Sequence, residues 1–118
     1  MELPEDGMLL RVFIGEADMH EGRPLYEQIV LKARELNLAG ATVLRGIMGY
    51  GASSRLHTTK VLRLSEDLPV VIEVVDTEER LRQLLPFLDE TVMDGMITLE
   101  KARVIKYRHN GKNLADGE

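Results

Sequence analysis

The order of the segments that have a strand or helix pattern restricts the fold of this chain more than any other feature. Apolar runs typical of strands occupy residues 8–14, 41–45, 69–75 and 96–107. The first and third runs are each followed by a segment whose apolar residues recur every three or four positions, as on one face of a helix. The resulting β-α-β-β-α-β order predicts an α+β, ferredoxin-like fold, in which an antiparallel sheet carries two helices on one face.

The two helices have different boundary signals. Pro24 is expected to open the first helix, because a missing N–H costs nothing at the first helical position, and residues 37–40 are expected to end it. Asp76 and Glu79 have the spacing of a capping box, which predicts the start of the second helix. Pro86 lies inside that helix and removes a backbone donor, so we expect the helix to be kinked or shortened there.

The strands also predict that something covers the second face of the sheet. In a lone domain of this kind, strands alternate apolar and polar residues, because one face meets water. Here the strand at 69–75 has valines on both faces, and the strand at 8–14 has apolar residues of both parities. Another copy of the same chain would cover such a face most simply, so we expect a homo-oligomer.

Length and hydrophobic content allow one domain. The chain has 118 residues, of which 44% are hydrophobic, enough for a single core and too few for two. We expect residues 8–108 to form this domain, with residues 1–7 and 109–118 as flexible tails. The last strand is expected to bend near residues 101–103.

The net charge and the cysteine content indicate which kinds of binding partner and which cellular compartment to expect. The formal net charge is -5, and the basic residues are spread along the chain, which argues against binding nucleic acid. The absence of cysteine is typical of a cytosolic chain. No segment approaches the roughly 20 apolar residues of a membrane span, and the N-terminus is acidic where a signal peptide is basic. We therefore expect a cytoplasmic protein whose partners are small molecules or proteins.

Three glycines follow the strand at 41–45, in the sequence Arg-Gly-Ile-Met-Gly-Tyr-Gly at residues 45–51. Glycine reaches positive φ and lets another molecule approach the backbone, so this loop could present bare N–H groups to an anion. Glycines after strands also commonly serve only to turn the chain or form a bulge. The pattern leaves both interpretations open and makes this loop the candidate site.

Individual polar residues have similar alternatives. His20 lies in an acidic loop that could bind a divalent cation, but no second histidine stands at ligand spacing, so a solvated loop is the simpler interpretation. His57 could contact phosphate or simply face water. Glu73 could be a paired charge, a water-facing group or a contact to a ribose or base, and the ligand contact is favoured. Phosphate contacts or plain solvation are open for Arg45, Arg55, Lys60, Arg63, Arg103, Lys106 and Arg108.

Several separated motifs carry a family resemblance. The segment order, the glycine loop, the run Leu-Pro-Val-Val-Ile-Glu-Val-Val at 68–75 and Asp94-Gly95 together resemble the PII signalling proteins. More closely, the chain resembles an uncharacterised PII-like family, and the similarity covers about residues 8–107. The motifs of that closer resemblance are Gly-Glu at 15–16, Gly-Arg-Pro-Leu-Tyr at 22–26, the glycine loop at 45–51 and Leu-Ser-Glu-Asp-Leu-Pro at 64–69.

The resemblance implies a function and a set of site residues. PII-like proteins are trimers that bind nucleotides between subunits and regulate a partner through a mobile loop after the second strand. The resemblance therefore implies that this chain forms a homotrimer and binds an adenine nucleotide. It also implies a membrane transporter or another protein as the target. The ligand-binding residues expected are Gly40, Thr42, Arg45, Gly49, Tyr50, Gly51, Glu73, Val75, Asp94, Gly95, Lys106 and Arg108.

Two departures from the PII pattern modify this expectation. Met96 follows the Asp-Gly turn where PII proteins have a lysine, so one phosphate-binding charge is missing. AMP or ADP is therefore favoured over ATP, and the sequence does not say whether a metal accompanies it. The loop at about 52–63 is also short for a PII protein, which argues against the PII partner set and against modification of a loop tyrosine.

Two other functions remain as alternatives to a sensor without catalysis. One is a small nucleotide hydrolase, although the sequence has no Ser-His-Asp order, P-loop or metal-ligand pair, so no catalytic residue is assigned. The other is a trimeric metal-binding or scaffold protein. RNA binding is disfavoured because the chain has only three tyrosines and two phenylalanines, and no aromatic stacking platform on its strands.

Overall fold

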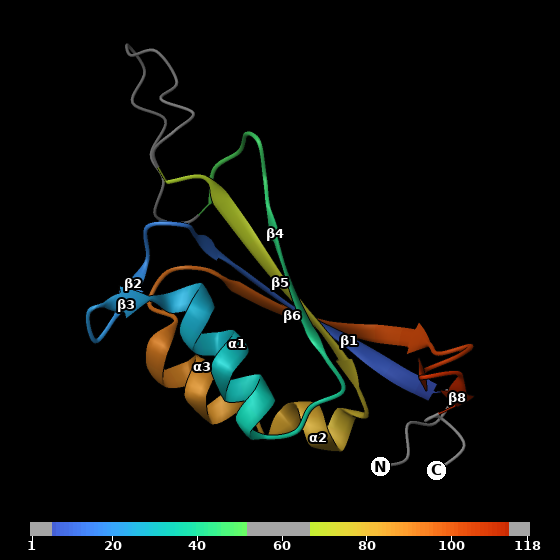
Figure 1. The fold of residues 1–118 in the computed structure, drawn as a ribbon. Helices are drawn as coiled ribbons and strands as arrows, with labels where there is room; N and C mark the ends of the chain where they lie inside the picture. Colours follow the sequence, from blue (N-terminus) through green and yellow to red (C-terminus); the bar gives the residue numbers. More distant parts are fainter. Residues whose placement is uncertain (1–5, 52–66, 114–118) are drawn as a thin grey trace.

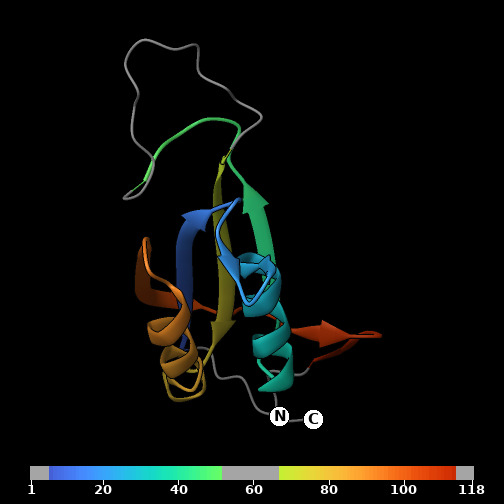
Figure 2. The same ribbon diagram turned by 90° about the vertical axis from the view of Figure 1, so that its left-hand side faces the viewer.

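The main sheet has four antiparallel strands with the helices on one of its faces. The computed structural model describes residues 6–51 and 67–113. The order across the sheet is β4-β5-β1-β6, with β1 at Asp6–Gly15, β4 at Ala41–Arg45, β5 at Pro69–Asp76 and β6 at Met96–Arg103. The helices are α1 (Leu25–Glu35), α2 (Glu78–Arg82) and α3 (Leu85–Thr91). Figures 1 and 2 show all three on the same side, which confirms the predicted ferredoxin-like arrangement.

The core lies between the helices and one parity of the central strands. β1 pairs with both β5 and β6, so that Leu10 lies opposite Val74 on one side and Leu99 on the other. Because side chains alternate along a strand, a slip of one residue would turn this whole apolar set toward the other face. The buried hydrophobic residues are Leu10, Val12, Ile14, Leu25, Ile29, Ala33, Leu38, Val70, Ile72, Val74, Leu81, Leu84 and Leu88.

The second helical segment is divided at Pro86, as predicted. α2 ends at Arg82, and α3 begins at Leu85 with Pro86 in its first turn, where the missing N–H is tolerated. The capping-box prediction is wrong, because the N-cap is Thr77, whose hydroxyl oxygen accepts from the N–H of Arg80 at 3.2 Å.

Asp76 is instead buried and joins three parts of the chain. Its side chain is fully buried and accepts hydrogen bonds from the N–H of Ala39 at 2.9 Å and of Thr77 at 2.7 Å. The Nε of Arg80 donates to the same carboxylate at 3.1 Å, and the Nη2 of Arg80 donates to the carbonyl of Asn37. The turn between α1 and β4 is therefore fixed to the start of α2.

Short hairpins add to the predicted elements. β2 (Met19–His20) and β3 (Arg23–Pro24) pair between β1 and α1, around Glu21 and Gly22, which both have positive φ. β7 (Arg108–His109) pairs with β8 (Lys112–Asn113), and this hairpin, apart from Arg108, lies in the segment expected to be a tail.

The outer limits of the sheet also differ from the prediction. β1 begins at Asp6, before the expected boundary at residue 8. β6 ends at Arg103, which lies opposite Asp6 of β1, short of the predicted end at residue 107. The predicted mobile loop, at about residues 52–63, lies wholly outside the described residues, and so do Arg55, His57, Lys60 and Arg63. None of the helices in the described ranges is long and apolar enough to cross a membrane.

Candidate functional site

The glycine loop begins where β4 ends and folds against Pro69. The N–H of Gly46 donates to the carbonyl of Pro69 at 2.7 Å, and a Cβ on Gly46 would lie 2.9 Å from Pro69 Cγ. Gly49 has a φ of 152°, and its Cβ would lie 3.1 Å from the same atom. A Cβ on Gly51 would meet no atom within 4 Å among the described residues. Packing within residues 6–51 and 67–113 therefore accounts for two of the three glycines.

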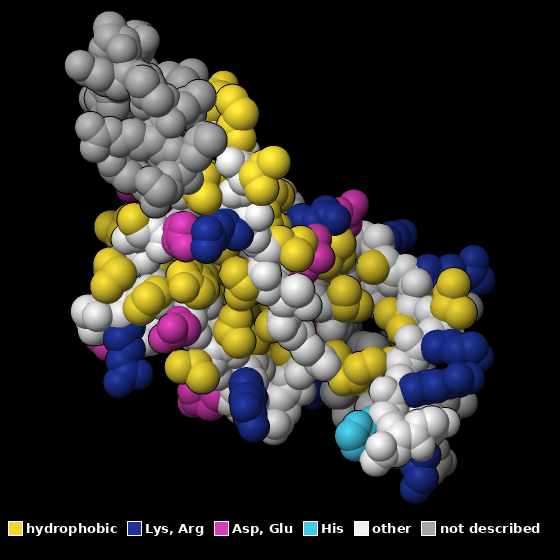
Figure 3. All heavy atoms as spheres, turned by 45° about the horizontal axis from the view of Figure 1, so that its top comes forward, with side chains coloured by type: hydrophobic (Ala, Val, Ile, Leu, Met, Phe, Trp, Pro, Cys, Tyr) yellow, Lys and Arg dark blue, Asp and Glu magenta, His cyan; other side chains and the backbone are white. Residues whose placement is uncertain are grey.

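Apolar side chains are exposed at this end of the sheet, which we call the glycine-loop end. Ile47 and Tyr50 are 87% and 70% exposed, and Met48 and Leu44 are also exposed. Figure 3 shows apolar side chains gathered on this part of the surface. The described part of the loop therefore offers backbone and apolar groups, with Arg45 as its cation.

The same end of the sheet carries an acidic cluster around the turn that follows β1. Asp18 accepts from the N–H of Gly15 at 3.0 Å, and Asp67 accepts from the N–H of Ala17 at 2.9 Å. Burial raises the pKa of Asp18, and the charges of Asp67 and Asp94 raise it further. Within residues 6–51 and 67–113, no group of three acidic or histidine side chains could hold a metal ion.

The pKa of Asp18 predicts a pH-dependent contribution to stability. The pKa of Asp18 in the folded chain lies above its ordinary value of 3.8. Just above pH 3.8, the folded chain therefore binds more protons than the unfolded chain. The contribution of Asp18 to the free energy of unfolding is thus present at low pH and is lost as the pH rises. Asp18→Asn keeps an acceptor for Gly15 and removes the charge. We expect the variant to be at least as stable as the parent at neutral pH, with the difference shrinking toward pH 4, measured by urea unfolding. A variant that is less stable at neutral pH would contradict this.

Arg45 and Gly95 also belong to the glycine-loop end. Arg45 Nε lies 3.4 Å from an oxygen of Glu16, an ion pair that the sequence pattern did not predict. A Cβ on Gly95 would lie 2.4 Å from the carbonyl oxygen of Phe13, so this glycine allows β6 to start beside β1. Asp94 precedes it in the same turn. The two strand-end loops named by the resemblance thus lie at one end of the sheet.

No helix or strand of the described residues covers the face of the sheet opposite the helices, and this face has a charged centre. Arg11 Nε lies 2.9 Å from Glu73 Oε2, and its Nη1 lies 2.5 Å from Glu100 Oε1. The hydrogen bond to Glu73, more than any other contact, raises the pKa of Arg11 above its ordinary value. Glu73 is therefore a paired charge, one of the alternatives left open by the sequence. Its pairing with Arg11 follows from strand register, in which the two residues lie directly opposite one another.

Thr42 and Val75 lie on this same face. Thr42 is opposite Glu73 across the β4–β5 pair, and Val75 is opposite Leu9 across the β5–β1 pair. The half-buried apolar side chains of Leu9, Phe13 and Val75 surround the charged centre. We call this surface the open face, consisting of Leu9, Arg11, Phe13, Thr42, Val71, Glu73, Val75 and Glu100.

Gly40, Lys106 and Arg108 lie at the other end of the sheet. Gly40 precedes β4, while Lys106 and Arg108 follow the end of β6. Figure 3 shows basic side chains gathered beside the C-terminal hairpin. We call this the basic end, after its exposed cations Lys101, Arg103, Lys106, Arg108 and Lys112.

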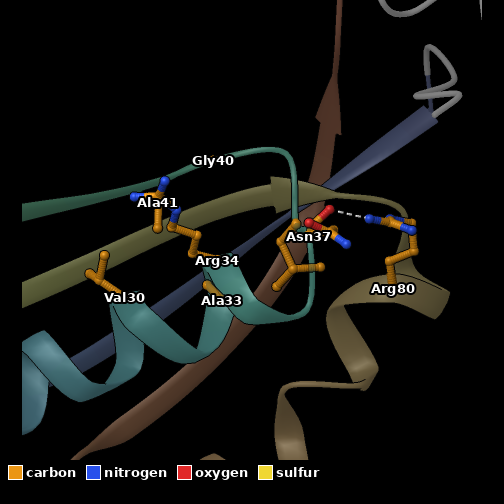
Figure 4. A pocket seen from close by; sticks show the side chains of 8 residues that line it. Val30, Ala33, Arg34, Asn37, Gly40, Ala41 and Arg80 are labelled. Carbon is orange, nitrogen blue, oxygen red and sulfur yellow. Dashed lines mark hydrogen bonds between the residues drawn. The ribbon is translucent and has the colours of Figure 1, made fainter.

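A hollow of about 700 Å³ lies next to Gly40, between the end of α1, the start of β4 and α2. Figure 4 shows Arg34, Asn37 and Arg80 around it, with the bond from Arg80 to Asn37 closing one side. No sequence pattern indicated this hollow, because it depends on how the turn after α1 packs against α2.

One chain does not gather all the predicted site residues. β1 has ten residues and spans roughly 30 Å, so the glycine-loop end and the basic end are far apart. The glycine-loop end holds Arg45, Gly49, Tyr50, Gly51, Asp94 and Gly95. The basic end holds Gly40, Lys106 and Arg108. The open face between the two ends holds Thr42, Glu73 and Val75.

Comparison with known sequences identifies similar proteins over most of the chain. Residues 7–104 match the family DUF190, described as an uncharacterized ACR. A UPF0166 protein of Aquifex aeolicus is 41% identical over 99 residues, which cover 82% of this chain and 91% of the relative. A UPF0166 protein of Methanocaldococcus jannaschii is 36% identical over 99 residues, covering 83% and 91%.

A solved structure has the same fold. It is a crystal structure of a protein from Thermus thermophilus, provisionally described as a PII-like signaling protein. The TM-score is 0.60 at 18% identity, and the match covers 89% of this chain and 94% of that one. The expected relation to the PII fold is thereby confirmed.

Proposed function

The chain belongs to the DUF190 family, and from this premise we propose that it is a non-catalytic, PII-like regulatory protein. In this proposal it works as a homotrimer, binds AMP or ADP between subunits, and signals to a protein target through the loop after β4. The solved PII-like neighbour, which shares the fold over nearly its whole length, supports the general class.

The observation that carries the proposal is the open face. Leu9 and Phe13 of the central strand point away from the helices and are only half-buried in one chain. An apolar surface of this kind in the middle of a sheet favours contact with another copy. Arg11 pairs with Glu73 and Glu100 within one chain, so a second copy could cover this face without leaving the Arg11 guanidinium unpaired.

Assembly would also explain the scattered site residues. The glycine-loop end supplies backbone donors but has several carboxylates nearby, whereas the basic end supplies cations. A phosphate needs both donors and positive charge. Joining the glycine-loop end of one subunit to the basic end of its neighbour would provide both, which supports a cleft between subunits.

Titration calorimetry against AMP, ADP and ATP, with and without magnesium, tests the proposal, with oligomer mass measured by light scattering. We expect a trimer that binds AMP or ADP with micromolar affinity and without turnover. Gly49→Val should abolish binding and leave the trimer intact, because a branched side chain tolerates a φ of 152° poorly and would press on Pro69. Met48→Val, in the same exposed loop, is the matched control and should bind normally.

Two results would refute parts of this proposal separately. A monomer at micromolar concentration would contradict the role of the open face. A trimer that binds none of the nucleotides would remove the ligand and leave a scaffold or metal-binding protein to be tested.

A further inference from the structure

Tyr107 ties the segment after β6 to the turn between α1 and β4. Its hydroxyl donates a hydrogen bond to the carbonyl oxygen of Ala39 at 2.5 Å, across 68 positions of the sequence. The N–H of Ala39 donates to the buried carboxylate of Asp76 at 2.9 Å. The backbone of Ala39 is thus held from both sides, and Tyr107 is attached to a fixed point.

Two exposed cations flank Tyr107 directly. Lys106 and Arg108 are its chain neighbours, so their Cα atoms lie about 3.8 Å from that of Tyr107. Among the described residues, neither takes part in an ion pair. The hydrogen bond of Tyr107 therefore also fixes the backbone that carries the side chains of Lys106 and Arg108.

The segment that carries these charges has little other support. Residues 104–107 pair with no strand among the described residues, and β7 pairs only with β8 in a hairpin of its own. Without the bond to Ala39, the cations would sample more positions and would lose more conformational entropy when they bind an anion.

We propose that Tyr107 is the positioning residue of the phosphate-binding part of the ligand site. Its hydrogen bond to Ala39 holds Lys106 and Arg108 next to the start of β4, ready to contact the phosphate groups of the nucleotide. This inference rests on the proposed function and assigns a residue to one half of that site.

The test compares Tyr107→Phe with the unaltered protein by titration calorimetry, using ADP and adenosine as probes. The variant keeps the ring and loses only the hydroxyl. We expect the affinity for ADP to fall about tenfold, the effect of losing one hydrogen bond, while the affinity for adenosine stays unchanged. Tyr26→Phe is the matched control, because no hydrogen bond of that hydroxyl is found among the described residues, and it should leave both affinities unchanged.

A double-mutant cycle separates positioning from a general structural role. In the charge-removed background Lys106→Gln/Arg108→Gln, which leaves the Tyr107 hydroxyl in place, adding Tyr107→Phe should weaken ADP binding no further. Equal losses in both backgrounds, equal losses for adenosine and ADP, or no loss at all would overturn the inference while the proposed function stands. Failure of the unaltered protein to bind either AMP or ADP would overturn both.

Discussion

Replacing Asp76 with alanine is expected to lower the free energy of unfolding by about 3–5 kcal/mol, as for one partner of a buried ion pair. The carboxylate is fully buried and accepts from the N–H groups of Ala39 and Thr77 and from Arg80. Its removal leaves these donors without their acceptor, and a buried donor without a partner keeps its full desolvation cost. Urea unfolding of the variant and the parent measures the difference.

The chain offers a closely matched control for this effect. Glu78 pairs with Arg82 at 2.7 Å with the same four-residue spacing as Asp76 and Arg80, but both side chains are about half exposed. Glu78→Ala should cost well under 1 kcal/mol, because exposed pairs of this spacing contribute about 0.3–0.5 kcal/mol. Similar losses for the two variants would mean that burial of Asp76 is not what makes it important.

The second large effect is expected from Gly95→Ala. The added Cβ would lie 2.4 Å from the carbonyl oxygen of Phe13, and this atom belongs to the backbone of the central strand, so it cannot move aside as a side chain can. The clash should separate the start of β6 from β1 and lower the free energy of unfolding by about 1–3 kcal/mol, the usual range for overpacking.

Gly40→Ala is the control for this substitution. A Cβ on Gly40 would meet no atom of the described residues within 4 Å, and the φ of Gly40 is not positive. The free energy of unfolding should stay within about 0.5 kcal/mol of the parent, as at most surface sites. A loss at Gly40 equal to that at Gly95 would show that the cost comes from the glycine type and not from the contact with Phe13.

The elements were predictable from sequence where the signal is local. The apolar run at 69–75 indicated the strand β5, and Pro86 indicated the break between α2 and α3, because each depends on residues close in the chain. Asp76 was misjudged because its spacing to Glu79 fits a cap, whereas one of the groups that it binds, the N–H of Ala39, is 37 positions away. The end of β6 was also predicted too late, at residue 107 instead of Arg103.

The candidate site was predictable only in part. The glycine loop was placed at the end of β4, and the structure gives Gly46 and Gly49 a packing reason; a role in binding stays a prediction. Arg11 was missed altogether, because its bridge to Glu73 and Glu100 exists only when three strands are in register. The separation of acidic and basic residues to opposite ends of the sheet likewise comes from strand direction, which no short motif contains.

The double attachment of Ala39 has a mechanical consequence. β4 begins two residues after this anchored peptide and ends at the glycine loop, where the N–H of Gly46 donates to the carbonyl of Pro69, so the strand is held at both ends. A displacement of the glycine loop would therefore pull on β4 between two fixed points. The displacement would reach the rest of the sheet through β5, which pairs with β4 over its whole length.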